Sequence, residues 1–218
     1  MSGRLVIAVD GPAAAGKGTL ARALADALGL PYLDTGLLYR AVGRRMLDAG
    51  LSPHEDAEPA ARALQPEDLR RTDLRTPEVD RAASAVASQP AVRTALLQFQ
   101  RGFGAEHGAV LDGRDIGTVI FPDARVKLFV TASTRSRAER RWKQMRGDAP
   151  VDAAGRAAAI DAVEAELLAR DAADSARATA PLRPAPDAVE IDSDALDADA
   201  VLREALRIVQ ARLAESGG

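Results

Sequence analysis

The chain has 218 residues, of which 47% are hydrophobic, and its formal net charge at neutral pH is −3. This length is enough for one sizeable core, so we predict a single domain. The mildly acidic balance argues against a nucleic-acid partner, and the lack of cysteine excludes disulfides, thiol catalysis and cysteine-bound metals. No apolar stretch approaches the ~20 residues that a membrane span requires, so we expect no membrane partner and a cytoplasmic location.

The first predicted strand leads into a glycine-bounded turn. The apolar run Leu5–Val9 predicts the strand, and a helical pattern begins at Lys17 and ends at Gly29. The glycines and the lysine of the turn fit the spacing G-x4-G-K of a phosphate-binding P-loop, whose backbone N–H groups cradle polyphosphate oxygens. The alternative is a glycine-rich β–α connection without a ligand. The predicted nucleotide-binding residues are Gly11, Pro12, Ala13, Ala14, Ala15, Gly16, Lys17, Gly18 and Thr19.

The position after the lysine is unusual for such a loop. It usually carries Ser or Thr as a ligand for Mg²⁺, but this chain has Gly18, and the hydroxyl of Thr19 follows one residue later. We therefore expect Mg²⁺ to be held mainly through phosphate oxygens and water, with no metal ligand assigned to the protein. Thr19 is expected to face a different phosphate, the α-phosphate.

The rest of the chain alternates short apolar runs with helical patterns. Strands are predicted at 31–33, 109–111, 126–130 and 188–191, and a helix at 37–49. Strands separated by helices are typical of an α/β fold, here a five-stranded parallel sheet with helices on both faces. Ligands bind such sheets beyond the carboxyl ends of the strands. Four aspartates are expected just there: Asp10, Asp34, Asp112 and Asp192.

Two helical segments interrupt this alternation. Residues 51–107 show no clear strand; Thr76 and Pro77 predict a helix start, and Pro90 opens another helix. Within 133–178, Ser133 can cap a first helix, a polar turn follows at 147–150, and a second helix begins near Asp152. We expect a pocket wall or second lobe, and then a helical hairpin that closes over phosphates; a solvated charged hairpin is the alternative. The first hairpin helix carries Arg135, Arg137, Arg140, Arg141 and Arg146.

Three short motifs add arginines and acids to the predicted edge of the sheet. Thr35 and Arg40 follow the second strand, and Arg40 could bind a phosphate, although a helix cap and a surface arginine are the more common explanation of this motif. Arg114 and Asp115 stand side by side after the third strand, which suits a charged, polar ligand. Near the end of the second hairpin helix, three charged residues at positions i, i+4 and i+7 share one helical face and could bind a ligand. An exposed ladder of ion pairs is the alternative interpretation. The three residues are Arg170, Asp174 and Arg177.

Together these stretches resemble the bacterial cytidylate kinases, which belong to the nucleoside monophosphate kinases with a P-loop. The resemblance covers nearly the whole chain in order. The P-loop alone marks only a superfamily, whereas DGRDIGTVIFPDA (112–124) and RDAADSARATAPL (170–182) are specific to cytidylate kinases. The other matching stretches are GPAAAGKGT (11–19), DTGLLYR (34–40), RTPEVDRAASAVA (75–87) and VRTALLQFQR (92–101).

The resemblance implies a monomeric P-loop kinase that uses ATP with Mg²⁺ to phosphorylate CMP and dCMP. It implies a core at 1–50, 108–134 and 179–218, a helical insertion for the monophosphate at about 51–107, and a short helical lid with flanking helices at about 135–178. A kinase for another monophosphate such as UMP or AMP, or a non-catalytic ATP-binding regulatory module, remains an alternative. In this comparison Lys17, Arg40, Arg114 and Arg177 are catalytic, and the substrate-binding residues are Thr35, Arg40, Ser84, Arg93, Arg114, Asp115, Arg170, Asp174 and Arg177.

Within that set the resemblance implies separate tasks. Three arginines bind the acceptor's phosphate, Ser84, Arg93 and Asp115 contact cytosine, and Arg170 with Asp174 binds the ribose. An ionised Asp115 is suited to its task, because a carboxylate accepts from the amino group of cytosine and meets a second acceptor in uracil.

Three departures from the family pattern are visible. Ala14 stands where many relatives have glycine, so we expect no positive φ at this position. Thr35 replaces a frequent serine and keeps the hydroxyl. Residues 51–75 are shorter than the corresponding insert of long family members, and the strands of that insert are expected to be missing.

Overall fold

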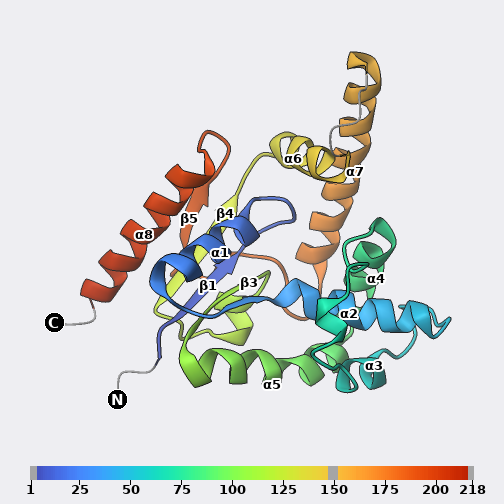
Figure 1. Ribbon diagram of the computed structural model, residues 1–218, viewed down its shortest axis with the longest axis horizontal. Helices are drawn as coiled ribbons and strands as arrows, with labels where there is room; N and C mark the ends of the chain where they lie inside the picture. The colour runs from blue at the N-terminus through green and yellow to red at the C-terminus, as the bar shows by residue number, and fades with distance from the viewer. Residues whose placement is uncertain (1–3, 147–151, 216–218) are drawn as a thin grey trace.

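A parallel β-sheet forms the centre of the computed structural model, which describes residues 4–146 and 152–215 (Figure 1). The sheet has five strands in the order β2-β3-β1-β4-β5, and every neighbouring pair is parallel. The predicted α/β fold is therefore confirmed. The strands are β1 (Val6–Asp10), β2 (Tyr32–Asp34), β3 (Ala109–Gly113), β4 (Val126–Thr131) and β5 (Val189–Asp192).

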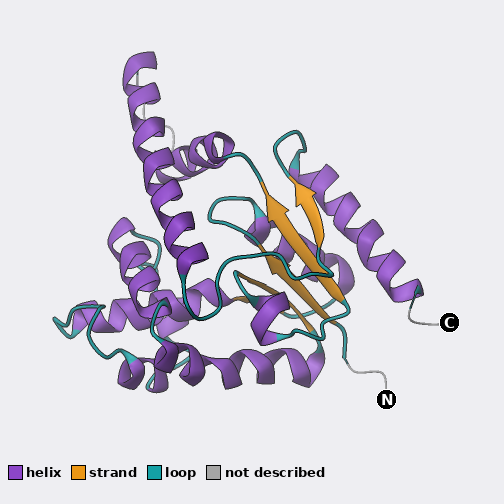
Figure 2. Ribbon diagram, turned by 180° about the vertical axis from the view of Figure 1, so that it is seen from behind, coloured by secondary structure: helices purple, strands orange, loops and turns teal. Residues whose placement is uncertain are grey.

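Helices cover both faces of the sheet, so every residue of β1 and β3 is buried. On one face, α1 (Lys17–Leu28) and α8 (Ala198–Ala214) pack on alternate strand residues, among them Ile7 and Val9. On the other face, seen in Figure 2, α5 (Pro90–His107) and the short π-helical turn η2 (Ile116–Ile120) pack on the intervening strand residues, such as Ala8. This alternation follows from the two-residue period of a strand.

A second cluster of helices lies beside the carboxyl ends of the strands. It consists of α2 (Thr35–Asp48), α3 (Glu58–Arg62), the 3₁₀ turn η1 (Asp68–Arg70), α4 (Pro77–Ala87) and the first half of α5. Residues 51–107 contain no strand, as predicted. The predicted cap is also present, since the hydroxyl of Thr76 accepts a hydrogen bond from the N–H of Val79 at 3.3 Å.

Two further helices, α6 (Thr134–Arg146) and α7 (Ala153–Ala176), stand next to the P-loop (Figure 1). They pack on each other and on Ala13 through a small apolar cluster that includes Ala138 and Ile160. Ser133 caps α6, as the sequence predicts, and Asp152, near which the second helix was expected to begin, caps α7. The predicted turn at 147–150 lies outside the described residues. Across the two described ranges, no helix is long and apolar enough to cross a membrane.

Candidate active site

A cavity of about 830 Å³ opens at the carboxyl ends of the strands. Its walls come from the P-loop, α2, α4, the end of β3, and helices α6 and α7. The loop residues from Ala13 to Thr19 line it, whereas Gly11 and Pro12 do not. The structure thus brings together residues that are far apart in the sequence. Every residue predicted to bind the acceptor lines this one cavity: Thr35, Arg40, Ser84, Arg93, Arg114, Asp115, Arg170, Asp174 and Arg177.

The glycines of the loop are required by its path. Gly11 has φ 149°, and a Cβ there would lie 2.1 Å from the carbonyl oxygen of Val130 in the neighbouring strand. Gly16 precedes α1 with φ 87°, a left-handed conformation that lets the chain turn sharply into the helix. The turn places the amino end of α1 at the cavity, where its free N–H groups and its dipole favour an anion.

The prediction for Ala14 is wrong. This residue has φ 60°, which costs a side-chain-bearing residue about 1 kcal/mol. Its methyl group packs against the apolar cluster between α6 and α7. The loop therefore keeps the backbone path that glycine allows, and contact with this cluster helps to offset the strain.

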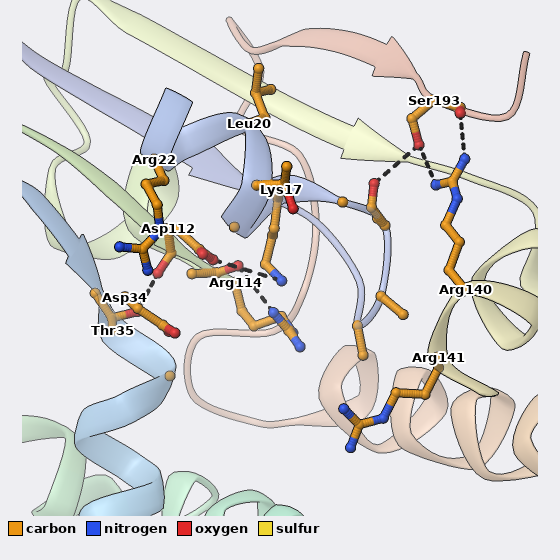
Figure 3. Close-up of a pocket in the computed structure, with 18 of the residues that line it drawn as sticks. Lys17, Leu20, Arg22, Asp34, Thr35, Asp112, Arg114, Arg140, Arg141 and Ser193 are labelled. Atoms are coloured by element: carbon orange, nitrogen blue, oxygen red, sulfur yellow. Dashed lines mark hydrogen bonds and ion pairs between the residues drawn. The ribbon is translucent and has the colours of Figure 1, made fainter. Parts of the chain in front are cut away.

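Lys17 points into the cavity beside Asp112 and Arg114 (Figure 3). Its Nζ lies 3.8 Å from a carboxylate oxygen of Asp112, and the residue is only 8% exposed. Burial, reinforced by repulsion from Arg114, lowers the pKa of Lys17 to about 8. The ammonium group is thus held in a setting that a polyphosphate would stabilise.

The same carboxylate explains the glycine at position 18. A Cβ on Gly18 would lie 2.9 Å from the second carboxylate oxygen of Asp112, which also accepts a hydrogen bond from the hydroxyl of Tyr32 at 3.0 Å. The hydroxyl of Thr35 in turn donates to the backbone carbonyl of Asp112 at 2.8 Å. A serine or threonine at position 18 would therefore require the carboxylate of Asp112 to shift.

Two carbonyl oxygens of the loop accept hydrogen bonds from side chains outside it. Arg137 donates to the carbonyl of Ala13 at 3.2 Å, and the hydroxyl of Ser193 donates to the carbonyl of Ala15 at 3.0 Å. Arg140 binds Ser193 at both its hydroxyl and its carbonyl (Figure 3). These contacts fix the base of α6 to the loop. Sequence reasoning missed Ser193, because nothing local to it signals this role.

The arginines of α6 divide into different groups. Arg140 and Arg141 line the cavity, as expected for a helix that faces phosphates. Arg137 is buried under the loop, and Arg135 pairs at the surface with acidic residues of α7, so neither lines the cavity. The helical period separates Arg135 from the other three. The side chain of Arg146 lies outside the described part of the chain.

A buried ion pair forms one end of the cavity. Arg93 of α5 donates to the Oδ2 atom of Asp115, and both side chains are less than a tenth exposed. The guanidinium group of Arg93 also lies over the ring of Tyr39, 5.5 Å from its centre. Ser84 lines the same region and donates to the carbonyl of Asp80 at 3.2 Å. The arrangement can offer both donors and acceptors to a planar polar ligand.

Arginines from distant segments meet in the middle of the cavity. Arg114 donates to Asp174 at 3.1 Å, and Arg177 lies 3.6 Å from the other oxygen of that carboxylate. Burial, with repulsion from neighbouring arginines, lowers the pKa of both Arg40 and Arg170 to about 10, so both remain charged at neutral pH. Among the described residues, Arg170 and Arg177 each keep a buried nitrogen without a hydrogen-bond partner. Such a site is suited to a multiply charged anion.

Two of the predicted edge aspartates do not line the cavity. The carboxylate of Asp10 accepts from the N–H groups of Ile116 and Gly117, both at 2.8 Å, and thereby holds η2 against β1. Burial raises the pKa of Asp10 to about 7. Asp192 is exposed at the end of β5. Within the described ranges, no three carboxylates or imidazoles gather as a metal site.

Comparisons with known proteins agree with this geometry. The family model for cytidylate kinase matches residues 7–211. A cytidylate kinase of Granulibacter bethesdensis is 61% identical over 95% of this chain and 97% of its own length, and one of Acidiphilium cryptum is 57% identical over 98% and 99%.

Among solved structures, a gluconokinase from Sinorhizobium meliloti 1021 superposes with a TM-score of 0.50 at 17% identity, covering 99% of this chain and 96% of its own. A sugar kinase from Janibacter sp. HTCC2649 gives 0.51 at 14% identity, with 95% of each chain covered. These two likenesses concern the fold alone. The family model and the full-length relatives together establish that this chain belongs to the cytidylate kinase family.

Proposed function

We propose that the protein transfers the γ-phosphate of ATP to CMP and dCMP, giving ADP and the corresponding diphosphate. The observation that supports this most directly is the shared cavity, where a P-loop faces a buried Arg93–Asp115 pair across a cluster of arginines. A regulatory ATP-binding module needs no second anion site, so the arginine cluster favours an enzyme. A preference for UMP or AMP is the alternative that the base-contacting residues disfavour.

On the donor side, the loop from Gly11 to Thr19 would hold the phosphates of ATP, with Lys17 at the β- and γ-phosphates and Thr19 at the α-phosphate. Mg²⁺ would be held mainly by phosphate oxygens and water. The residues present fit this arrangement, because no hydroxyl stands at position 18 and the carboxylate of Asp112, which lines the cavity beside Lys17, could accept hydrogen bonds from metal-bound water. When bound, the metal would neutralise part of the phosphate charge.

On the acceptor side, the proposed roles follow the positions around the cavity. Asp115 would accept from the amino group of cytosine, Arg93 would donate to its carbonyl oxygen O2 or its ring nitrogen N3, and Ser84 and Thr35 would complete the pocket. Arg170 and Asp174 would bind the ribose. The acceptor's phosphate would lie among Arg40, Arg114 and Arg177, which are contributed by α2, the end of β3 and the end of α7.

In the reaction, an oxygen of the acceptor's phosphate attacks the γ-phosphorus in line. The bond from this phosphorus to the β–γ bridging oxygen breaks, and ADP leaves with the electron pair. No general base is needed, because the attacking oxygen is already ionised at neutral pH. Arg140 and Arg141, which line the cavity, would neutralise the charge that spreads over the transferring group and would help to exclude water.

We also assign the core to residues 1–50, 108–134 and 179–218, the monophosphate-binding insertion to about 51–107, and the lid with its flanking helices to about 135–178. We propose a monomer that works in the cytoplasm, where both nucleotides are found. Light scattering at the working concentration tests the monomeric state, and a dimer would contradict it.

The proposed function is tested by coupled ADP release with CMP, dCMP, UMP and AMP as acceptors at equal concentration. We expect the highest kcat/KM with CMP or dCMP. A higher value for UMP or AMP would support the alternative kinase, and ATP binding without acceptor-dependent ADP release would support the regulatory module.

A further inference from the structure

A carboxylate lies inside the arginine cluster of the cavity. Asp80, in the first turn of α4, contacts three guanidinium groups that come from three other helices. Its Oδ1 atom accepts from Arg40 of α2 and lies 4.0 Å from Arg170 of α7, and its Oδ2 atom accepts from Arg141 of α6. Its side chain is 12% exposed and lines the cavity.

These contacts differ from those of an ordinary surface ion pair. Arg40 and Arg141 are two of the groups proposed above to bind phosphates, and Arg40 and Arg170 repel each other in a poorly solvated site. An anion at their centre offsets that repulsion. Asp80 supplies such an anion from the protein itself, with its two oxygens directed at different helices.

We propose that Asp80 is a positioning residue that holds Arg40, Arg141 and Arg170 together before the nucleotide binds. It then releases Arg40 to the acceptor's phosphate, and its contacts with Arg141 and Arg170 loosen at the same time. The proposal rests on the proposed function only in naming CMP as the bearer of that phosphate. Through Arg141 and Arg170 the same carboxylate joins α4 to α6 and α7. Binding of the acceptor and separation of α4 from the lid helices are thereby coupled.

This arrangement has two consequences of opposite sign. Without ligand, the carboxylate stabilises the folded protein, because it compensates buried positive charge. With ligand, it competes with the acceptor's phosphate for Arg40 and repels that phosphate as a like charge. Asp80→Asn keeps the shape and removes the charge. We expect the variant to be less stable without ligand, and yet to bind CMP at least about threefold more tightly than the unchanged protein.

Two variants serve as controls. Glu78→Gln removes one negative charge from the same helical turn, but this side chain is 62% exposed, pairs loosely with Arg44 at 3.9 Å and does not line the cavity. Asp80→Glu retains the charge at the position itself. Both should bind CMP with nearly the affinity of the unchanged protein, so a change confined to Asp80→Asn reports the charge of this residue alone.

The experiment combines thermal unfolding with calorimetric titration for the four proteins. The ligands are CMP and, separately, inorganic phosphate added with ADP present to fill the P-loop. We expect a lower unfolding temperature for Asp80→Asn without ligand and a larger increase with either ligand. Equal or weaker binding by Asp80→Asn would overturn the proposal and leave Asp80 as a structural ion pair. Because phosphate is used without cytosine, this result does not depend on whether CMP is the substrate.

A measurement on the unchanged protein covers the case in which Asp80→Asn fails to fold. The carboxyl ¹³C resonance of Asp80 should shift when CMP or phosphate saturates the site, because its guanidinium partners leave, while that of Glu78 stays. An Asp80 resonance that does not shift at saturation would refute the release of the arginines.

Discussion

The ion pair between Arg93 and Asp115 allows the base preference to be tested with one substitution, Asp115→Asn. The pair is buried, with side-chain exposures of 7% and 8%. An amide in place of the carboxylate loses a charge-assisted hydrogen bond to the amino group of cytosine, worth about 1.5–3 kcal/mol. This corresponds to a fall of about 10- to 150-fold in kcat/KM for CMP.

The same substitution should affect UMP differently. Asparagine has an amide N–H₂ that can donate to the carbonyl oxygen of uracil, whereas the carboxylate presents only acceptors to it. The value of kcat/KM for UMP should therefore stay or rise, and the ratio of CMP to UMP should fall by at least about tenfold. The assay is coupled ADP release over a range of each acceptor, with ATP saturating.

The stability of the variant provides an independent measurement. Removing one member of a buried ion pair costs about 3 kcal/mol or more, since the charge of Arg93 loses its partner. For a chain of this size, that lowers Tm by about 6–12 °C. Asp171→Asn is the matched control, because it breaks the ion pair with Arg137 under the P-loop and does not line the cavity. It should be destabilised and keep the CMP-to-UMP ratio. An equal loss for both acceptors in Asp115→Asn would refute the base-contacting role.

Three further predictions concern the P-loop and the insertion. Burial lowers the pKa of Lys17 to about 8, and bound polyphosphate should raise it. Above pH 8 the dissociation constant of ATP, measured by calorimetry, should therefore increase nearly tenfold per pH unit. The same measurement on Lys17→Met should give a dissociation constant that does not change between pH 7.5 and 9.5. Gly11→Ala should lose more than about 3 kcal/mol in urea unfolding, because its Cβ would lie 2.1 Å from the carbonyl oxygen of Val130; unchanged stability would contradict the described loop path. Thr76→Ala should lose about 1 kcal/mol and 2–4 °C in Tm through its missing cap, with kcat/KM preserved, and a calorimetric scan with no such shift would argue against that cap.

Local signals predicted most of the fold. The apolar runs located both ends of all five strands to within two residues. Gly29, Thr76 and Ser133 marked helix boundaries that the structure confirms. These features depend on neighbours in the chain: the period of a strand, a cap three residues from its partner, or a left-handed turn. The prediction for Ala14 failed because the contact that helps offset its strain comes from α6 and α7, which are distant in sequence.

The candidate site was predictable as a set of residues but not as a network. Family motifs indicated the arginines, and all of the predicted acceptor residues line one cavity. Which carboxylate meets which guanidinium depends on the packing of helices against one another, and this has no local pattern. Asp80 and Ser193 were missed for that reason, and Arg135 was expected at the phosphates although it faces the surface.

The bonds from α6 to the P-loop carbonyls limit how the lid can rearrange. Arg137 and Arg140 connect the first two turns of α6 to Ala13 and Ser193. If the whole helix moved, these hydrogen bonds would break and the carbonyl groups of the P-loop would no longer be fixed. The N–H groups of the loop would then lose the orientation that directs them toward a ligand. If the P-loop is to keep its conformation, any large movement must therefore be confined to the part of α6 that follows Arg140. Nucleotide exchange can then occur without dismantling the anion cradle between turnovers.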